Sequence, residues 1–137
     1  MKLTGLTPNL FTEDIDRATA FYRDVLGFSV TTTVPEAAPF VFVWLQRDAV
    51  SVFLNDLASA RRESPALTGV AVGTSGVSMF IHVEGIGEIW ESVRLRARVV
   101  MPIVDQWYGM TEFAVADPDG YLVTFAERRA ASDEAAS

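Results

Sequence analysis

Residues 14–28, which read DIDRATAFYRDVLGF, decide the fold of this chain. Asp14 has the short acceptor side chain of a helix N-cap, and Gly27 suits the left-handed position that follows a last helical turn. Apolar residues between them recur at helical spacing, at Ile15, Ala18, Tyr22 and Val25, with Phe21 and Leu26 beside them. The pattern predicts one amphipathic helix, whose apolar stripe must be buried against the β-type segments on either side.

Extended segments surround this helix and then recur. The first set comprises residues 3–12, where Pro8 indicates an edge strand, then 28–34, 40–45 and 49–54. A joint rich in Ala, Ser and Gly follows, with room for a short helix. The second set comprises a strand at 77–83, a helix at 86–97, a strand at 99–104, and a hairpin of 111–116 and 121–126 around the turn at 117–120.

The order β-α-β-β-β therefore occurs twice, and residue 15 of the first set corresponds to residue 86 of the second, an offset of 71. We expect an α+β fold of two βαβββ modules, an internal duplication whose curved mixed sheets enclose a cleft, with the helices outside. The predicted organisation is a single domain over 1–129, made of module one (1–56), a joint (57–76) and module two (77–129), followed by a flexible tail at 130–137.

Composition excludes several classes of function. The chain has 137 residues and a formal net charge of −7, which argues against nucleic acid as a partner and favours neutral or cationic small ligands. It has no cysteine, which excludes disulfides and thiolate chemistry. The opening residues do not read as a signal peptide, and no segment approaches a membrane span. We expect a cytoplasmic protein without membrane partners.

Two segments resemble the signatures of the vicinal oxygen chelate superfamily, which contains glyoxalase I, extradiol dioxygenases, fosfomycin-resistance enzymes and bleomycin-resistance proteins. They are residues 21–28, FYRDVLGF, and residues 117–127, DPDGYLVTFAE. The resemblance extends to about Arg128. It implies the duplicated fold but no single activity, because the fold hosts several chemistries as well as plain binding proteins.

Enzymes of this superfamily hold one divalent metal with His, Glu or Gln side chains, two from each half. By analogy, the corresponding positions here are Thr7, Ser51, Ser78 and Thr124. Neutral hydroxyls are poor ligands beside imidazole or carboxylate, so the resemblance predicts that the inherited metal site is absent, with no cofactor and no catalytic residue.

Strand alternation predicts what lines the cleft instead. With a two-residue loop at 47–48, Trp44 lies opposite Ser51 and shares its face with Phe40, Phe42 and Phe53. In the second half Ser78 shares a face with Phe80 and His82, and a four-residue loop at 117–120 places Phe113 opposite Thr124. Trp107 and Tyr108 precede this hairpin, and we expect them at the mouth of the predicted cleft. The predicted ligand-binding set is Phe40, Phe42, Trp44, Ser51, Phe53, Ser78, Phe80, His82, Trp107, Tyr108, Phe113 and Thr124.

Other interpretations remain open. Inner-face aromatics are often simple core, and Trp107 and Tyr108 also suit a dimer contact. His82 is the single histidine, and a lone histidine at the end of a strand is more often a structural residue than a catalytic one.

The leading hypothesis is a drug-like small-molecule binding protein resembling the bleomycin-resistance group, which acts by sequestration as a homodimer. The alternative is a metal-dependent lyase, isomerase or dioxygenase that recruits its metal through His82 and nearby carboxylates. A third is a structural or regulatory homodimer without a ligand.

Overall fold

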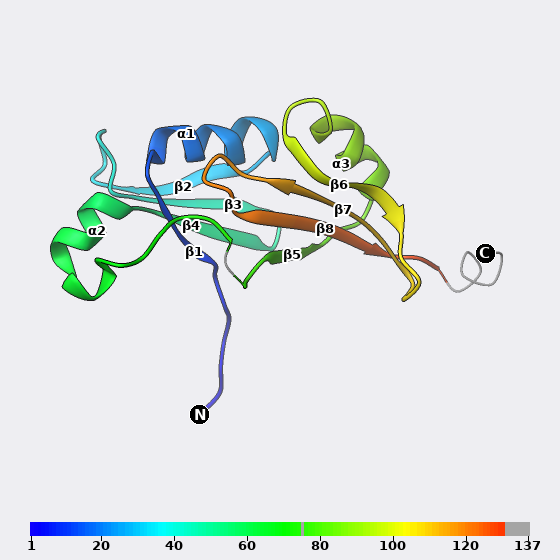
Figure 1. Ribbon diagram of the computed structural model, residues 1–137, viewed down its shortest axis with the longest axis horizontal. Coiled ribbons are helices and arrows are strands. Elements are labelled where there is room, and N and C mark those ends of the chain that lie inside the picture. The colour runs from blue at the N-terminus through cyan, green and yellow to red at the C-terminus, as the bar shows by residue number, and fades with distance from the viewer. Residues whose placement is uncertain (75, 131–137) are drawn as a thin grey trace. The chain divides into compact units, whose positions relative to one another are not determined.

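The computed structural model describes residues 1–74 and 76–130, and the chain forms two compact units, Met1–Val72 and Gly73–Ser137. Each unit is one four-stranded mixed sheet with a helix across one face (Figure 1). Within the described ranges no helix is long and apolar enough to cross a membrane.

The first unit contains a sheet with the strand order β1-β4-β3-β2, in which β1 runs parallel to β4 and the other neighbours are antiparallel. Its elements are β1 (Asn9–Thr12), α1 (Ile15–Ala20), the π-helical turn η1 (Phe21–Val25), β2 (Ser29–Val34), β3 (Phe42–Arg47), β4 (Val50–Asp56), α2 (Leu57–Glu63) and the 3-10 turn η2 (Pro65–Leu67).

The second unit repeats this arrangement, because its strand order β5-β8-β7-β6 places equivalent strands in equivalent positions. Its elements are β5 (Met79–His82), α3 (Ile86–Val93), β6 (Arg98–Asp105), β7 (Met110–Ala116) and β8 (Leu122–Arg128). Helix α1 begins at Ile15 and helix α3 at Ile86, so the predicted offset holds at the helix starts. The α+β class and the duplication into two βαβββ modules are therefore confirmed.

The first helix has the predicted caps. The Asp14 side chain accepts a hydrogen bond from the Arg17 amide at 3.0 Å. Gly27 has a φ of +77°, and the Arg47 guanidinium donates to the Leu26 carbonyl at 2.7 Å beside it. A Cβ at Gly27 would lie 3.1 Å from Arg47 Nη1, so both the backbone angle and the space favour glycine there.

Alternation along the strands separates each sheet into two faces. In the first unit the helix covers Val43, Leu45, Val52 and Leu54, which are buried. In the second unit Phe113, Val115, Val123 and Phe125 are buried, and the Trp90 ring of α3 lies 5.1 Å from the Phe113 ring. The helix-covered faces are therefore the cores of the two units.

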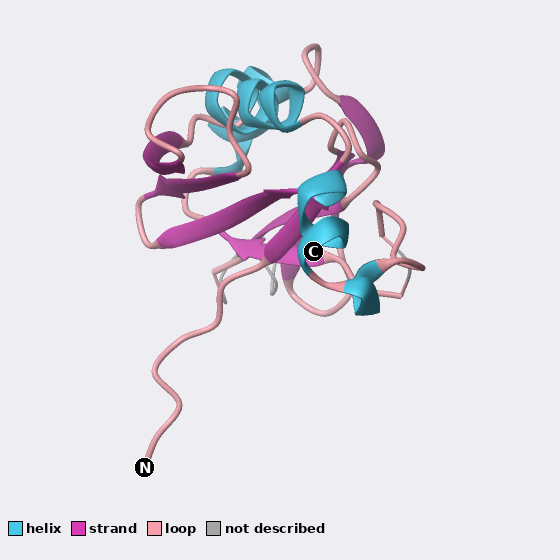
Figure 2. Ribbon diagram, turned by 90° about the vertical axis from the view of Figure 1, so that its left-hand side faces the viewer, coloured by secondary structure: helices cyan, strands magenta, loops and turns pink. Residues whose placement is uncertain are grey.

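Several predicted boundaries are wrong. The first strand begins at Asn9 rather than at residue 3, and the chain before it runs away from its sheet as an extended arm (Figures 1 and 2). Helix α3 ends at Val93 rather than at residue 97, and β5 begins at Met79 rather than at residue 77. Of the predicted tail, residues 131–137 lie outside the described residues.

Candidate functional site

An aromatic cluster covers the face of the first sheet opposite α1. Phe42 and Trp44 of β3 alternate with the buried Val43 and Leu45, and Trp44 pairs directly with Phe53 of β4. The Phe53 ring centroid lies 5.1 Å from that of Phe42 and 5.6 Å from that of Trp44, with edge-to-face geometry in both pairs. All three rings are half-buried.

A hydroxyl accompanies these rings, since the Trp44 indole N–H donates to Ser51 Oγ at 3.2 Å. Ser51 pairs with Gln46, not with Trp44 as predicted, because the turn lies at residues 48–49 and Asp48 takes a φ of +50°. The register error is two residues, so every side chain keeps the predicted face. The predicted sharing of one face by Phe42, Trp44, Ser51 and Phe53 is confirmed.

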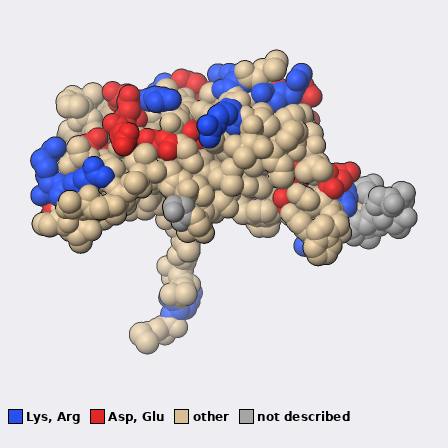
Figure 3. Space-filling model, in the orientation of Figure 1, with Lys and Arg blue, Asp and Glu red and all other residues tan. Residues whose placement is uncertain are grey.

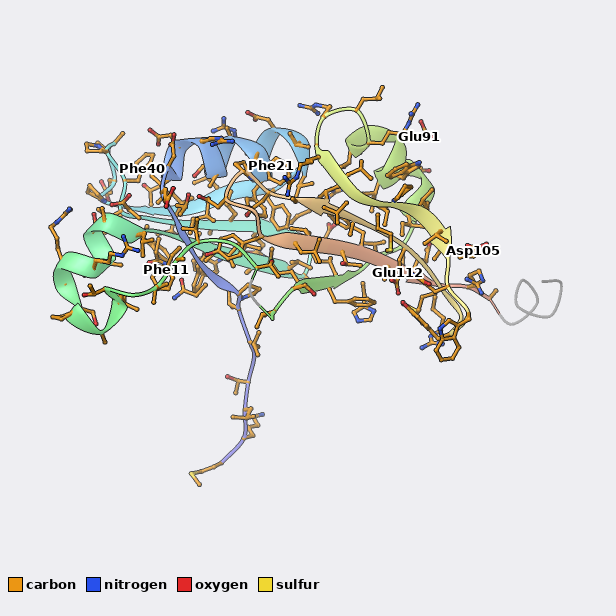
Figure 4. The ribbon with its side chains drawn as sticks, viewed as in Figure 1. Phe11, Phe21, Phe40, Glu91, Asp105 and Glu112 are labelled. Carbon is orange, nitrogen blue, oxygen red and sulfur yellow. The ribbon has the colours of Figure 1, made fainter. Side chains whose placement is uncertain are left out.

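Phe40 lies outside this cluster's strands, because β3 begins at Phe42. Strand alternation consequently does not apply to it, although its side chain is half-buried. Sequence reasoning missed Phe11, which aligns with Asn55 in the parallel β1–β4 ladder and so shares the face of Phe53. In Figure 4, Phe11 and Phe21 lie on opposite sides of this sheet.

In the second unit the face opposite α3 carries Phe80 and His82 of β5. Their ring centroids lie 5.1 Å apart, and Phe80 is 46% exposed. Phe80 pairs with Thr124, and Ala114 lies opposite Thr124 on β7. Ser78 is exposed and immediately precedes β5. Phe80, His82 and Thr124 therefore share one face, as predicted.

The predicted position of Phe113 is wrong. Phe113 pairs with Phe125, the two rings stack at 5.0 Å, and Phe113 is fully buried under α3. The register differs by one residue because β8 begins at Leu122, so that Ala116 pairs with Leu122 and not with Tyr121. A one-residue change moves a side chain to the opposite face, which assigns Phe113 to the core of its unit.

The positions at which the superfamily would place metal ligands carry hydroxyl groups in both units. Thr7 precedes β1, and Thr124 is 8% exposed in β8. Within residues 1–74 and 76–130 no group of three or more His, Asp or Glu side chains is arranged to hold a metal ion. Because hydroxyls are weak donors to divalent metals, this donor set does not fit the superfamily's metal.

The turn between β6 and β7 carries the two remaining predicted residues. Trp107 is 92% exposed and Tyr108 is 43% exposed. The Tyr108 hydroxyl donates to Glu112 Oε2 at 2.6 Å, and this hydrogen bond, together with burial and the carboxylate charge, raises the pKa of Tyr108. Glu112 is 3% exposed and shares a row with Ala126 and His82. Glu112 is not in the predicted ligand-binding set, but it is one of the carboxylates near His82 on which the metal-dependent alternative relies.

The outer sides of the helices offer a different surface. In the view of Figure 3 charged side chains gather over α1, α2 and α3. Solvated charge of this kind matches the polar stripe of an amphipathic helix, so the aromatic faces of the sheets are the better candidates for ligand contact.

Comparisons with known proteins agree with this architecture. A family model described as Glyoxalase/Bleomycin resistance protein/Dioxygenase superfamily matches residues 6–125. A bleomycin resistance protein of Geobacillus stearothermophilus is 31% identical over 127 residues, an alignment that covers 86% of this chain and 92% of the relative.

Solved structures share the fold at lower identity. A glyoxalase/bleomycin resistance protein/dioxygenase from Nocardioides has a TM-score of 0.72 and 19% identity, covering 96% of this chain and 87% of that one. A lactoylglutathione lyase from Agrobacterium tumefaciens has a TM-score of 0.68 and 21% identity, covering 90% of this chain and 92% of that one. These two likenesses show the fold alone.

Proposed function

The chain belongs to the glyoxalase/bleomycin resistance protein/dioxygenase superfamily, and on that premise we propose that it is a small-molecule binding protein that acts by sequestration. The observation that carries the proposal is the aromatic cluster of Phe42, Trp44 and Phe53. These rings lie on the face opposite α1, so they are not part of the helix–sheet core. The name of the 31% identical relative, a bleomycin resistance protein, supports the same class of function.

The chemistry of the cluster indicates the class of ligand. Half-buried rings in edge-to-face contact offer a rigid apolar surface, and the Ser51 hydroxyl adds a polar group that can orient a bound molecule. The second unit offers Phe80, His82 and Thr124 on the corresponding face of its own sheet. With a net charge of −7, the ligand proposed is a planar aromatic molecule that is neutral or cationic.

The test is ligand binding followed by tryptophan fluorescence and calorimetry, with bleomycin and a panel of planar aromatic drugs. We expect Trp44→Ala and Phe53→Ala each to weaken binding by about tenfold, because each removes an aromatic contact surface. Trp90→Phe is the matched control, since Trp90 packs against Phe113 on the helix side of the second unit. Unchanged affinity in both cluster variants would reject the proposal.

We also propose that the protein is a homodimer. Leu3 and Leu6 in the extended arm are 100% and 90% exposed, and apolar side chains in this state favour burial against another chain. Light scattering should give the mass of a dimer, and Leu3→Asp with Leu6→Asp should shift the equilibrium toward monomer. A cytoplasmic location and the lack of nucleic-acid partners remain predictions from the sequence.

A further inference from the structure

The chain has only two asparagines, Asn9 and Asn55, and the fold joins them. Asn9 is the first residue of β1, and Asn55 lies in β4, the strand that runs parallel to β1. The Asn55 side-chain amide donates a hydrogen bond to Asn9 Oδ1, across 46 positions of sequence. Asparagine is uncommon in strands, because its side chain competes with the backbone ladder for hydrogen bonds. Strand propensity therefore does not explain the pair.

The asparagine pair lies beside the aromatic cluster of the first sheet. Asn9 aligns with Phe53 of β4, and Asn55 lies between Phe11 of β1 and Phe42 of β3. The residues that alternate with the two asparagines in their strands are buried on the side of α1. Both amides therefore lie on the face opposite α1, in contact range of the rings to which the binding function is assigned.

The pair leaves one donor group and one acceptor group unused. A carboxamide has two N–H donors and an oxygen that can accept two hydrogen bonds. Among residues 1–74 and 76–130, the bond between the two asparagines is the only side-chain hydrogen bond that either amide makes. Asn9 Nδ2 and Asn55 Oδ1 thus have no partner in the described chain. A rotation of both amides by 180° exchanges nitrogen and oxygen and leaves the same count.

These unused groups are open to solvent and held in position. Asn9 is exposed, Asn55 is half-buried, and the hydrogen bond between them lies at the surface. A bond between solvated amides contributes little to folding, because both amides bind water in the unfolded chain. It does fix the orientation of both side chains, which reduces the entropy lost when a ligand binds to them.

We propose that Asn9 and Asn55 form a polar subsite for a lactam or carboxamide group on a planar aromatic ligand. Asn9 Nδ2 donates to the carbonyl oxygen of the ligand, and Asn55 Oδ1 accepts from its N–H, while Phe53 and Phe42 contact its ring. The inference rests on the proposed binding function, because it names the polar group that the ligand carries.

The experiment compares 2-quinolinone, which is a lactam, with coumarin, a lactone of the same shape in which an oxygen replaces the N–H. Titrations of the ¹⁵N-labelled full chain are followed by calorimetry and by the side-chain amide resonances of the two asparagines. The variant Asn9→Leu removes one of these resonances and thereby assigns both. We expect 2-quinolinone to bind about tenfold more tightly than coumarin and to shift both resonances, because only the lactam satisfies the Asn55 acceptor.

Three variants test the role of the acceptor. Asn55→Leu removes the acceptor with little change in side-chain volume and should abolish the preference for the lactam. Asn55→Asp keeps an acceptor oxygen at the same position and should preserve it. Gln46→Leu is the matched control, since it removes an exposed carboxamide from the same face at the other end of β3 and should leave the preference unchanged.

Several results would overturn the subsite. Equal affinity for the two ligands, or asparagine resonances of the wild-type chain that do not move when the lactam binds, would show that the pair is not read, while the aromatic binding function stands. A preference that survives Asn55→Leu, or that Gln46→Leu abolishes, would place the lactam elsewhere. Lower thermal stability of Asn55→Leu with an unchanged preference would assign the pair to the β1–β4 ladder alone.

Failure of both bicyclic ligands separates the two proposals. If neither ligand binds but bleomycin or a member of the drug panel does, the subsite is rejected and the proposed function is kept. If none of these molecules binds, the proposed function is rejected together with the subsite.

Discussion

Two carboxylates, Asp14 and Glu127, show that the role of a single residue is set by the hydrogen-bond donors that face it. The Asp14 side chain accepts from the amide three residues later and caps α1, as the sequence predicts. The Glu127 side chain of β8 accepts from the amides of Gly85 and Ile86 at 2.9 and 3.2 Å and so caps α3 from a neighbouring element. Gly85 has no side chain to supply this cap. A local sequence pattern does not reveal an acceptor that comes from another strand.

The Glu127 cap should be measurable. Glu127→Ala should lower the free energy of unfolding by about 1–2 kcal/mol, because it leaves two helix N-terminal amides without their acceptor. Asp14→Ala, with one amide affected, should cost about 1 kcal/mol. Urea unfolding followed by circular dichroism gives both values, and Glu36→Ala serves as the control at an exposed position outside the helices. A free energy of unfolding that Glu127→Ala leaves unchanged would contradict the capping role.

The Tyr108–Glu112 hydrogen bond also predicts a pH dependence. Removing the proton from Tyr108 would place a phenolate beside a carboxylate, which raises the pKa of this tyrosine above its ordinary value of about 10. The stabilisation is complete below pH 10 and is lost as the pH rises through the raised value. Absorbance titration should show a high-pH tyrosine transition that disappears in Tyr108→Phe and moves down in Glu112→Gln. An identical titration curve for Glu112→Gln would disprove the coupling.

At the scale of elements, the two faces of the first sheet differ in what they contribute. Leu45 is fully buried under α1, whereas Phe53 is half-buried on the opposite face. Leu45→Ala should cost about 2–5 kcal/mol, and Phe53→Ala should cost less than Leu45→Ala despite the larger side chain removed. Chemical denaturation of both variants makes the comparison. A larger loss for Phe53→Ala would make the aromatic cluster a second core instead of a binding surface.

The elements also show where prediction from sequence succeeds. Helix α1 was predictable because its caps and its apolar stripe are local. The face of Trp44 was predictable in spite of a wrong turn, since a shift of two residues preserves alternation. The face on which Phe113 lies was not predictable, because the turn sequence does not fix whether β8 starts at Tyr121 or Leu122. The sequence predicts a strand before Asn9 because nothing in the composition of this arm distinguishes a paired segment from an unpaired one.

At the scale of the molecule, the duplication was visible in the sequence because both helices start at matching points of their modules. The cleft and the ligand-binding set remain predictions. Ligand contact in each unit is best tested with variants of the residues on that unit's own sheet. Glu112 could have been found by extending the alternation from Ala126, its partner on β8, had the register been known. The burial of Glu112 depends on residues from other elements that pack over it, and the alternation of residues within one strand does not predict these contacts.

Metal content is the property of the molecule that separates the two leading functions. The hydroxyl donors at Thr7, Ser51, Ser78 and Thr124 predict that no divalent metal contributes to folding. Incubation with EDTA should therefore leave the melting temperature unchanged, and titration with Zn²⁺, Fe²⁺, Mn²⁺ or Ni²⁺ should show no micromolar uptake. A fall in melting temperature with EDTA would restore the enzyme alternative.

The strand order has a consequence for synthesis on the ribosome. In each module the first strand pairs with the last one made, since β1 joins β4 and β5 joins β8. The Gly85 amide also lacks its hydrogen-bond acceptor until Glu127 has been synthesised, 42 residues later. The second module thus cannot close as it emerges, and its nascent strands stay exposed until β8 has been translated. The first module, by contrast, can be complete by then and can serve as a folded neighbour on the growing chain.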